Sequence, residues 1–108
     1  MKRGDIVIAA ARGPSTGKPR PALIVQSDLF NPTHPSVTVC LISTDFTDAS
    51  LFRVAVAPGE RTGLKQPSQI MIDKIVSLPR EHVSSVIGHI DAETGEHVNN
   101  ALRRWLTV

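Results

Sequence analysis

The chain has 108 residues, a length that fits one domain spanning 1-108 with a single modest core. Apolar residues make up 41% of it and charged residues 20%, which is ordinary for a globular protein and excludes disordered and fibrous classes. The net charge of +2 permits a polyanionic partner without requiring one. No apolar run approaches the roughly 20 residues of a membrane span, and Met1 to Asp5 contain no apolar signal region. We therefore expect a cytoplasmic protein with no membrane partner.

Cysteine and histidine give no evidence of a metal or cofactor. Cys40, the only cysteine, lies in an apolar segment and is expected to pack in the core. The four histidines, at positions 34, 82, 89 and 97, are scattered and have no metal-ligand spacing such as His-Glu-x-x-His. We expect no metal and no cofactor. A histidine acting as catalytic acid or base is a less favoured alternative to ordinary surface or packing roles.

Apolar and β-branched runs predict short strands separated by glycine, proline and polar residues. The expected strands are 5–10, 21–25, 37–42, 52–56, 68–76 and 86–90. Residues 26–32 are expected to form a short helical turn capped by Ser27 or Asp28. The pattern predicts a small, strongly curved sheet closing into a partial barrel.

The C-terminal segment predicts the one clear helix. Asp91 can cap it, and apolar residues recur at helical spacing at Val98, Ala101, Leu102, Trp105 and Leu106. One face of this helix should therefore pack on the sheet, which makes the fold class mainly β with a C-terminal helix. We expect Trp105 in the core or in a dimer interface.

Arg20 lies between two prolines, directly before the apolar run 21–25. The prolines restrict the backbone and favour an extended conformation, so a guanidinium is held at the mouth of a core strand. Its planar fork matches phosphate oxygens and stays charged at neutral pH. The functional interpretation is a phosphate ligand, and the alternative is a solvated charge at a strand end.

The segment 12–19, just before Arg20, holds two glycines, two prolines and the cations Arg12 and Lys18. We expect a loop that brings positive charge beside Arg20 and faces a phosphate. The glycine spacing does not match a P-loop. A solvated hairpin loop is the alternative.

Two further positions carry polar groups at or within apolar strands. Ser43 and Thr44 follow the run 37–42, where their hydroxyls either reach a ligand or cap a turn. Asp73 lies in the otherwise apolar run 68–76, and it either turns to solvent or pairs with a cation in a site.

The order of these motifs resembles the MazF/PemK toxins, which are sequence-selective endoribonucleases of bacterial toxin–antitoxin pairs. The resemblance rests on Gly4-Asp5-Ile6-Val7, the segment from Arg20 to Asp28, a strand ending in Ser43-Thr44, then Thr62-Gly63-Leu64 and a strand containing Asp73. It implies an SH3-like barrel of the CcdB/MazF kind. It also implies a homodimer that holds single-stranded RNA in its groove and is inhibited by a MazE-type antitoxin.

By the same resemblance, Arg20 matches the catalytic arginine of the family, and Ser43, followed by Thr44, takes the place of a catalytic threonine. Asp73 matches a carboxylate of some members and is a candidate acid or base, although Met71 stands where those members have an arginine. Candidate RNA-binding residues are Arg12, Lys18 and Gln26.

Metal-free RNA cleavage uses the neighbouring 2′-hydroxyl as nucleophile and leaves a cyclic phosphate and a 5′-hydroxyl. It requires charge stabilisation, which Arg20 can supply, and proton transfer, for which a serine or threonine hydroxyl is a poor base. The identity of the base stays open. An alternative function is a CcdB-like toxin that poisons DNA gyrase by binding through the C-terminal helix, and a further one is an inactive relic.

Overall fold

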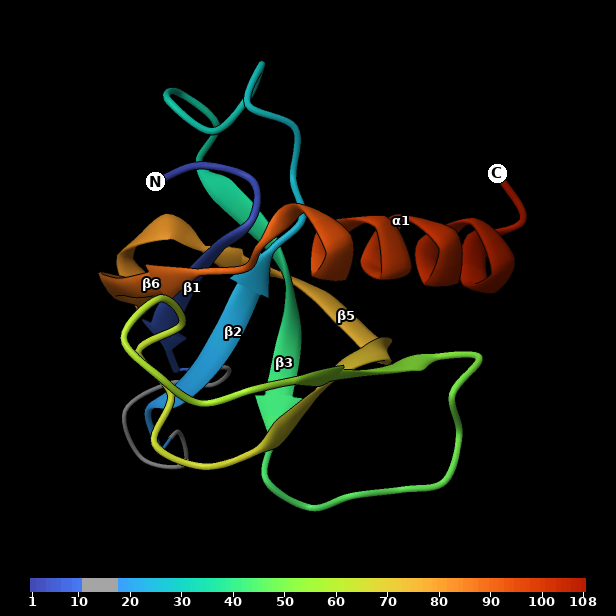
Figure 1. Cartoon of the computed structure of the whole chain (residues 1–108). Coiled ribbons are helices and arrows are strands. Elements are labelled where there is room, and N and C mark those ends of the chain that lie inside the picture. The colour runs from blue at the N-terminus through green and yellow to red at the C-terminus, as the bar shows by residue number, and fades with distance from the viewer. Residues whose placement is uncertain (11–17) are drawn as a thin grey trace.

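The computed structural model describes residues 1–10 and 18–108. Within these residues it contains one antiparallel sheet of six strands in the order β4-β5-β3-β2-β1-β6 (Figure 1). The elements along the chain are β1 (Asp5–Ala9), β2 (Arg20–Ile24), β3 (Ser36–Ser43), β4 (Arg53–Val56), β5 (Ser68–Pro79), the 3-10 turn η1 (Arg80–His82), β6 (Val83–His89) and α1 (Ala92–Leu106).

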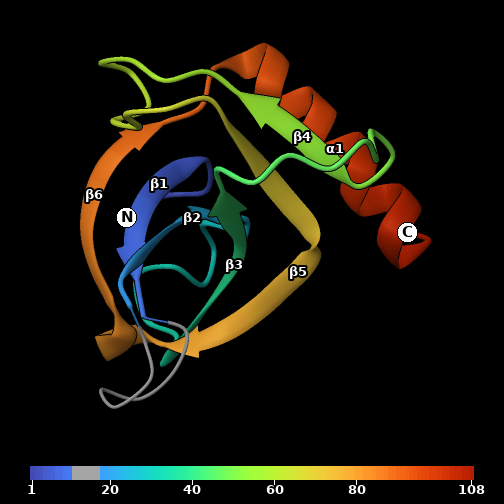
Figure 2. The ribbon, with the colours of Figure 1, turned by 90° about the horizontal axis from the view of Figure 1, so that it is seen from below.

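The sheet is strongly curved (Figure 2), and the pairing of its longest strand, β5, is irregular. The start of β5 lies between β4 and the end of β3 and pairs with both, while its later part pairs with the first half of β3. The register between β3 and β5 shifts between Cys40 and Ile42, an irregularity of the kind that bends a strand. Figure 2 shows β5 and β6 curving round on opposite sides of β1, β2 and β3. The predicted curved sheet with a terminal helix is confirmed.

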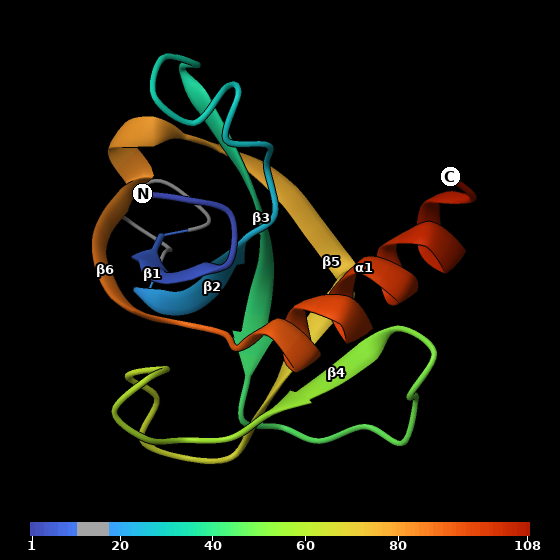
Figure 3. The ribbon, with the colours of Figure 1, turned by 45° about the horizontal axis from the view of Figure 1, so that its top comes forward.

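Two apolar clusters lie on opposite faces of this sheet. Alternation along β2 sends Leu23 into one cluster and Ala22 and Ile24 into the other. The first cluster also receives the buried residues of α1, which contacts β4 and β5 (Figure 3). The second cluster contains Val7, Ala9, Val37, Val39 and Leu78. The helix α1 therefore covers one face of the sheet, and the second apolar cluster lies on the other face.

The helix begins as the sequence predicts. The side chain of Asp91 caps it by accepting a hydrogen bond of 2.8 Å from the backbone N–H of Thr94. Val98, Ala101 and Leu102 are buried, but Trp105 is 47% exposed and packs its ring against Phe52 with 5.6 Å between centroids. Trp105 is thus outside the core, which leaves the interface alternative.

Some boundaries differ from the expected ones for identifiable reasons. Residues 26–32 form turns without a helix, and Ser27 Oγ accepts the backbone N–H of Leu29 at 3.1 Å. The strand β6 begins at Val83, earlier than expected, since Ser84 and Ser85 are exposed on an edge strand and carry no apolar pattern. No helix among the described residues is long and apolar enough to cross a membrane.

Candidate functional site

One row of residues runs across five strands of the sheet. Ala9 on β1 pairs with Arg20, Ser43 on β3 pairs with Gln69, and Gln69 pairs with Ala55 on β4. The register that sets Ala22 opposite Leu41, continued by two residues, sets Arg20 opposite Ser43.

Residues directly opposite each other in an antiparallel sheet share a face, with Cα atoms about 4.5 to 5.5 Å apart. Arg20, Ser43 and Gln69 therefore lie side by side on one face, which is the face of the second apolar cluster.

Arg20 is exposed at the first position of β2. Within residues 1–10 and 18–108 its guanidinium has no ion-pair partner. Lys18, two residues earlier, is also exposed. An exposed guanidinium on a fixed strand end can bind an anion from solvent without first breaking an internal ion pair.

Ser43 is the hydroxyl that accompanies Arg20. It is half-buried, and its Oγ accepts the backbone N–H of Asp45 at 3.0 Å, so it does cap the turn after β3. Its own hydroxyl hydrogen is still able to donate to a ligand. Thr44 is exposed and lies one residue past the strand end, where alternation directs it away from the face of Ser43.

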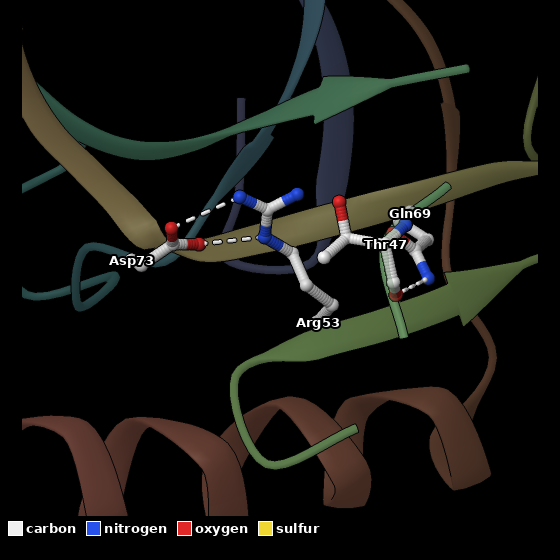
Figure 4. Close-up of polar contacts among 4 residues, drawn as sticks. All are labelled: Thr47, Arg53, Gln69 and Asp73. Atoms are coloured by element: carbon white, nitrogen blue, oxygen red, sulfur yellow. Dashed lines mark hydrogen bonds and ion pairs between the residues drawn. The ribbon is translucent and has the colours of Figure 1, made fainter. Parts of the chain in front are cut away.

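Gln69, which pairs with Ser43 in the same row, is a residue that the sequence analysis did not single out. It is 8% exposed, and its amide makes two hydrogen bonds with the backbone of Thr47, from Nε2 to the carbonyl oxygen and from the N–H to Oε1, both 3.0 Å (Figure 4). Gln69 thereby fastens the segment after Ser43 to β5. A glutamine at the start of an apolar strand was the one signal available.

Asp73 pairs with Arg53, which the sequence analysis also missed. The Arg53 Nε donates to Oδ1 at 2.8 Å and Nη2 donates to Oδ2 at 3.0 Å, a bidentate pair with side chains 12% and 16% exposed (Figure 4). The hydrogen bonds from Arg53 hold the pKa of Asp73 below its ordinary value. Of the two alternatives for Asp73, pairing with a cation is the one that the structure has.

The two predicted RNA-binding residues that the structure describes, Lys18 and Gln26, lie at opposite ends of β2. Gln26 lies past the opposite end of β2 from Arg20, where its Oε1 accepts the backbone N–H of Thr38 at 3.1 Å and its Nε2 donates to Asn31 at 3.0 Å. Arg12 lies outside the described residues. Of the two described residues, Lys18 is the one near Arg20, two residues before it in the chain.

Two other chemistries are not supported by the described residues. No group of three His, Cys, Asp or Glu side chains among them is arranged to hold a metal ion. Burial raises the pKa of the Cys40 thiol to about 12, so it stays protonated and is not a nucleophile at neutral pH.

Comparison with known proteins adds relatives and structures of one kind. Residues 2–106 match the family described as PemK-like, MazF-like toxin of type II toxin–antitoxin system. A probable endoribonuclease MazF of Mycolicibacterium smegmatis is 50% identical over 94 residues, covering 87% of this chain and 84% of the relative. Endoribonuclease EndoA of Bacillus subtilis is 28% identical over 106 residues, covering 95% and 91%.

Solved structures agree with the fold over nearly the whole chain. The Mycobacterium tuberculosis toxin MazF-mt6 superposes with a TM-score of 0.83 at 26% identity, covering 96% of this chain and 97% of that one. An endoribonuclease in complex with its cognate antitoxin from a Mycobacterial species has a TM-score of 0.84 at 20% identity, covering 100% and 96%. The second likeness shows the fold alone.

Proposed function

Because this chain belongs to the family of PemK-like, MazF-like toxins of type II toxin–antitoxin systems, we propose that it is an endoribonuclease that cleaves single-stranded RNA. The observation that carries the proposal is the pairing of an exposed guanidinium, Arg20, with the hydroxyl of Ser43 on one face of the sheet. A cation and a hydroxyl donor in one row are what a negatively charged phosphate requires.

In the proposed reaction, the RNA 2′-hydroxyl attacks the neighbouring phosphorus while the bond to the 5′-oxygen breaks. A proton leaves the 2′-oxygen and a proton is delivered to the 5′-oxygen, giving a 2′,3′-cyclic phosphate and a 5′-hydroxyl. Arg20 stabilises the charge that builds up on the non-bridging oxygens, and Ser43 donates a hydrogen bond to one of them. Each oxygen of Asp73 accepts a hydrogen bond from Arg53, which lowers the pKa of the carboxyl and makes it a weaker base, so we assign these proton transfers to another group.

The toxin assignment also implies a partner and a setting. Among the similar solved structures is MazE-MazF of Deinococcus radiodurans, with a TM-score of 0.81 at 19% identity. We infer a MazE-type antitoxin whose acidic, extended segment covers the exposed cations Arg20 and Lys18 and so competes with RNA. The cytoplasm, where RNA and antitoxin meet, is the proposed location.

The test is incubation of the purified protein with a defined RNA in excess EDTA, followed by mapping of both new ends. We expect cleavage at a recurrent sequence, leaving a 5′-hydroxyl and a cyclic or 3′ phosphate. Activity that chelation abolishes and a divalent ion restores would contradict metal-independent cleavage. Intact RNA together with inhibited gyrase supercoiling would instead support the CcdB-like alternative.

A further inference from the structure

The Arg53–Asp73 pair lies on the same face as the row of Arg20 and Ser43. Arg53 on β4 is directly opposite Met71 on β5, and Ala55 and Gln69 form the pair two residues further along. Because positions two apart on a strand share a face, Arg53 projects on the side of Gln69. Figure 4 shows its guanidinium lying along β5 between Asp73 and Gln69.

The pair leaves part of the guanidinium available. Asp73 receives the N–H groups of Nε and Nη2, which fixes the plane of the fork. The third nitrogen, Nη1, has no hydrogen-bond partner in the described part of the chain, and Figure 4 shows one nitrogen pointing away from Asp73 toward Thr47. A guanidinium held in this way presents directed donors in a partly desolvated place, where hydrogen bonds to an anion are strong.

Stability alone gives little reason for such a pair. Ion pairs that are largely removed from water lose much of their Coulomb energy to desolvation, and apolar replacements are often neutral or stabilising. The side chains of Arg53 and Asp73 are only 12% and 16% exposed.

Arg53 lies three strands from Arg20 in the sheet, a separation of about 14 Å at the usual strand spacing. At this separation the two guanidinium groups would contact different phosphates.

We propose that Arg53 is a second phosphate-binding residue, which contacts a phosphate of the same RNA strand other than the scissile one, and that Asp73 is a positioning residue acting through Arg53. This inference rests on the proposed function. It changes the role expected of Asp73 from proton transfer to orientation of a cation.

The experiment measures binding apart from cleavage. The probe is a fluorescent 2′-O-methyl oligonucleotide of the sequence that the wild-type protein cleaves, because the methyl group removes the attacking hydroxyl. Kd is measured by anisotropy at several salt concentrations, since each phosphate contact adds about 0.7 to the slope of log affinity against log salt for a single strand. The variants are Arg53→Met, Asp73→Asn and the double substitution Arg53→Met with Asp73→Leu.

The matched control is Arg61→Met. It removes one arginine charge from another ion pair, with Asp91 at 3.5 Å, whose side chains are 60% and 43% exposed. We expect Arg53→Met to weaken binding about tenfold or more and to lower the salt slope by about 0.7, whereas Arg61→Met keeps the wild-type slope. Asp73→Asn should weaken binding less, and the double substitution should bind no worse than Arg53→Met alone.

The double substitution leaves no unpaired carboxylate, so it keeps the test valid if Arg53→Met does not fold. If the wild-type protein cleaves and binds RNA while the Arg53 variants keep its Kd and slope, the pair is structural and this inference is wrong, although the proposed function stands. A wild-type protein that neither cleaves nor binds RNA overturns the proposed function and this inference with it.

Discussion

At the scale of single residues, the candidate site depends on how firmly each polar group is held. Arg20 has a proline on each side and sits in a strand that pairs with β1, so its backbone is fixed while its side chain is exposed. Ser43 is fixed by the strand and by its hydrogen bond to the backbone of Asp45. A phosphate would therefore meet donors that need little reorganisation, which is the condition under which electrostatic stabilisation is most effective.

Substitutions at these positions should separate the roles. Arg20→Lys keeps the charge but loses the fork, so we expect kcat to fall by about 10²-fold to 10³-fold with an unchanged melting temperature. Ser43→Ala should lose activity, and also some stability through the lost turn cap, whereas Thr44→Ala should stay close to the wild type. Ser43→Thr, which keeps the hydroxyl, is the control and should remain active. Equal, near-wild-type rates for all of these variants would show that the row is structural.

At the scale of elements, the loop between β4 and β5 is joined to the distant edge strand β6 through two glycines. A Cβ added at Gly88 would lie 2.3 Å from the carbonyl carbon of Thr62, and one added at Gly63 would lie 2.2 Å from the carbonyl oxygen of Ile87. The backbone N–H of His89 donates to the carbonyl of Arg61 at 2.8 Å. These close backbone contacts cover one side of the first apolar cluster, in which Leu64 is buried.

Gly88→Ala should therefore destabilise the protein. Because the obstructing atoms are backbone, the loop has to shift, and we expect a loss of roughly 1 to 3 kcal/mol in the free energy of unfolding, measured by urea denaturation. Gly95→Ala is the control. The nearest atom to its added Cβ is Ile90 Cδ1 at 3.9 Å, and alanine favours a helix, so this variant should be as stable as the wild type or more so. Equal stability of the two variants would contradict a tight loop contact.

At the scale of the whole molecule, the sequence predicts local structure more directly than it predicts contacts between distant residues. The cap at Asp91 and the apolar spacing that follows it predict α1, because a helix is specified by neighbours in the chain. Arg53 and Asp73 meet only because β4 and β5 pair in one register, and Gln69 reaches Ser43 only past the shift between Cys40 and Ile42. Gln26 and Arg20 belong to the same short segment of the sequence, but they lie at opposite ends of β2.

The outer surface near the C-terminus favours the homodimer that the sequence resemblance implies. Large apolar side chains there are exposed, namely Leu51 at 65%, Trp105 at 47%, Leu106 at 49% and Val108 at 83%. Leu106 and Val108 also border a groove of about 450 Å³ whose lining includes the apolar residues Val25 and Ile75. Trp105, Leu106 and Val108 are near neighbours in the chain, and Arg104 donates to the carbonyl oxygen of Leu51, so these side chains lie in one region of the surface. A second copy would offer a matching apolar region.

Leu106→Glu should separate such a dimer, because it places a charge on the surface that the dimer would bury. We expect sedimentation at micromolar concentration to show two copies for the wild type and one for Leu106→Glu, with unchanged circular dichroism. If RNA must be held between two copies, the RNA cleavage rate of Leu106→Glu should fall along with its sedimenting mass. The control, Val86→Glu, changes a side chain of similar exposure, 50%, on the edge strand β6 and should remain dimeric. A wild-type protein that sediments as one copy while cleaving RNA would refute the dimer, and equal dissociation by both variants would refute this surface as its interface.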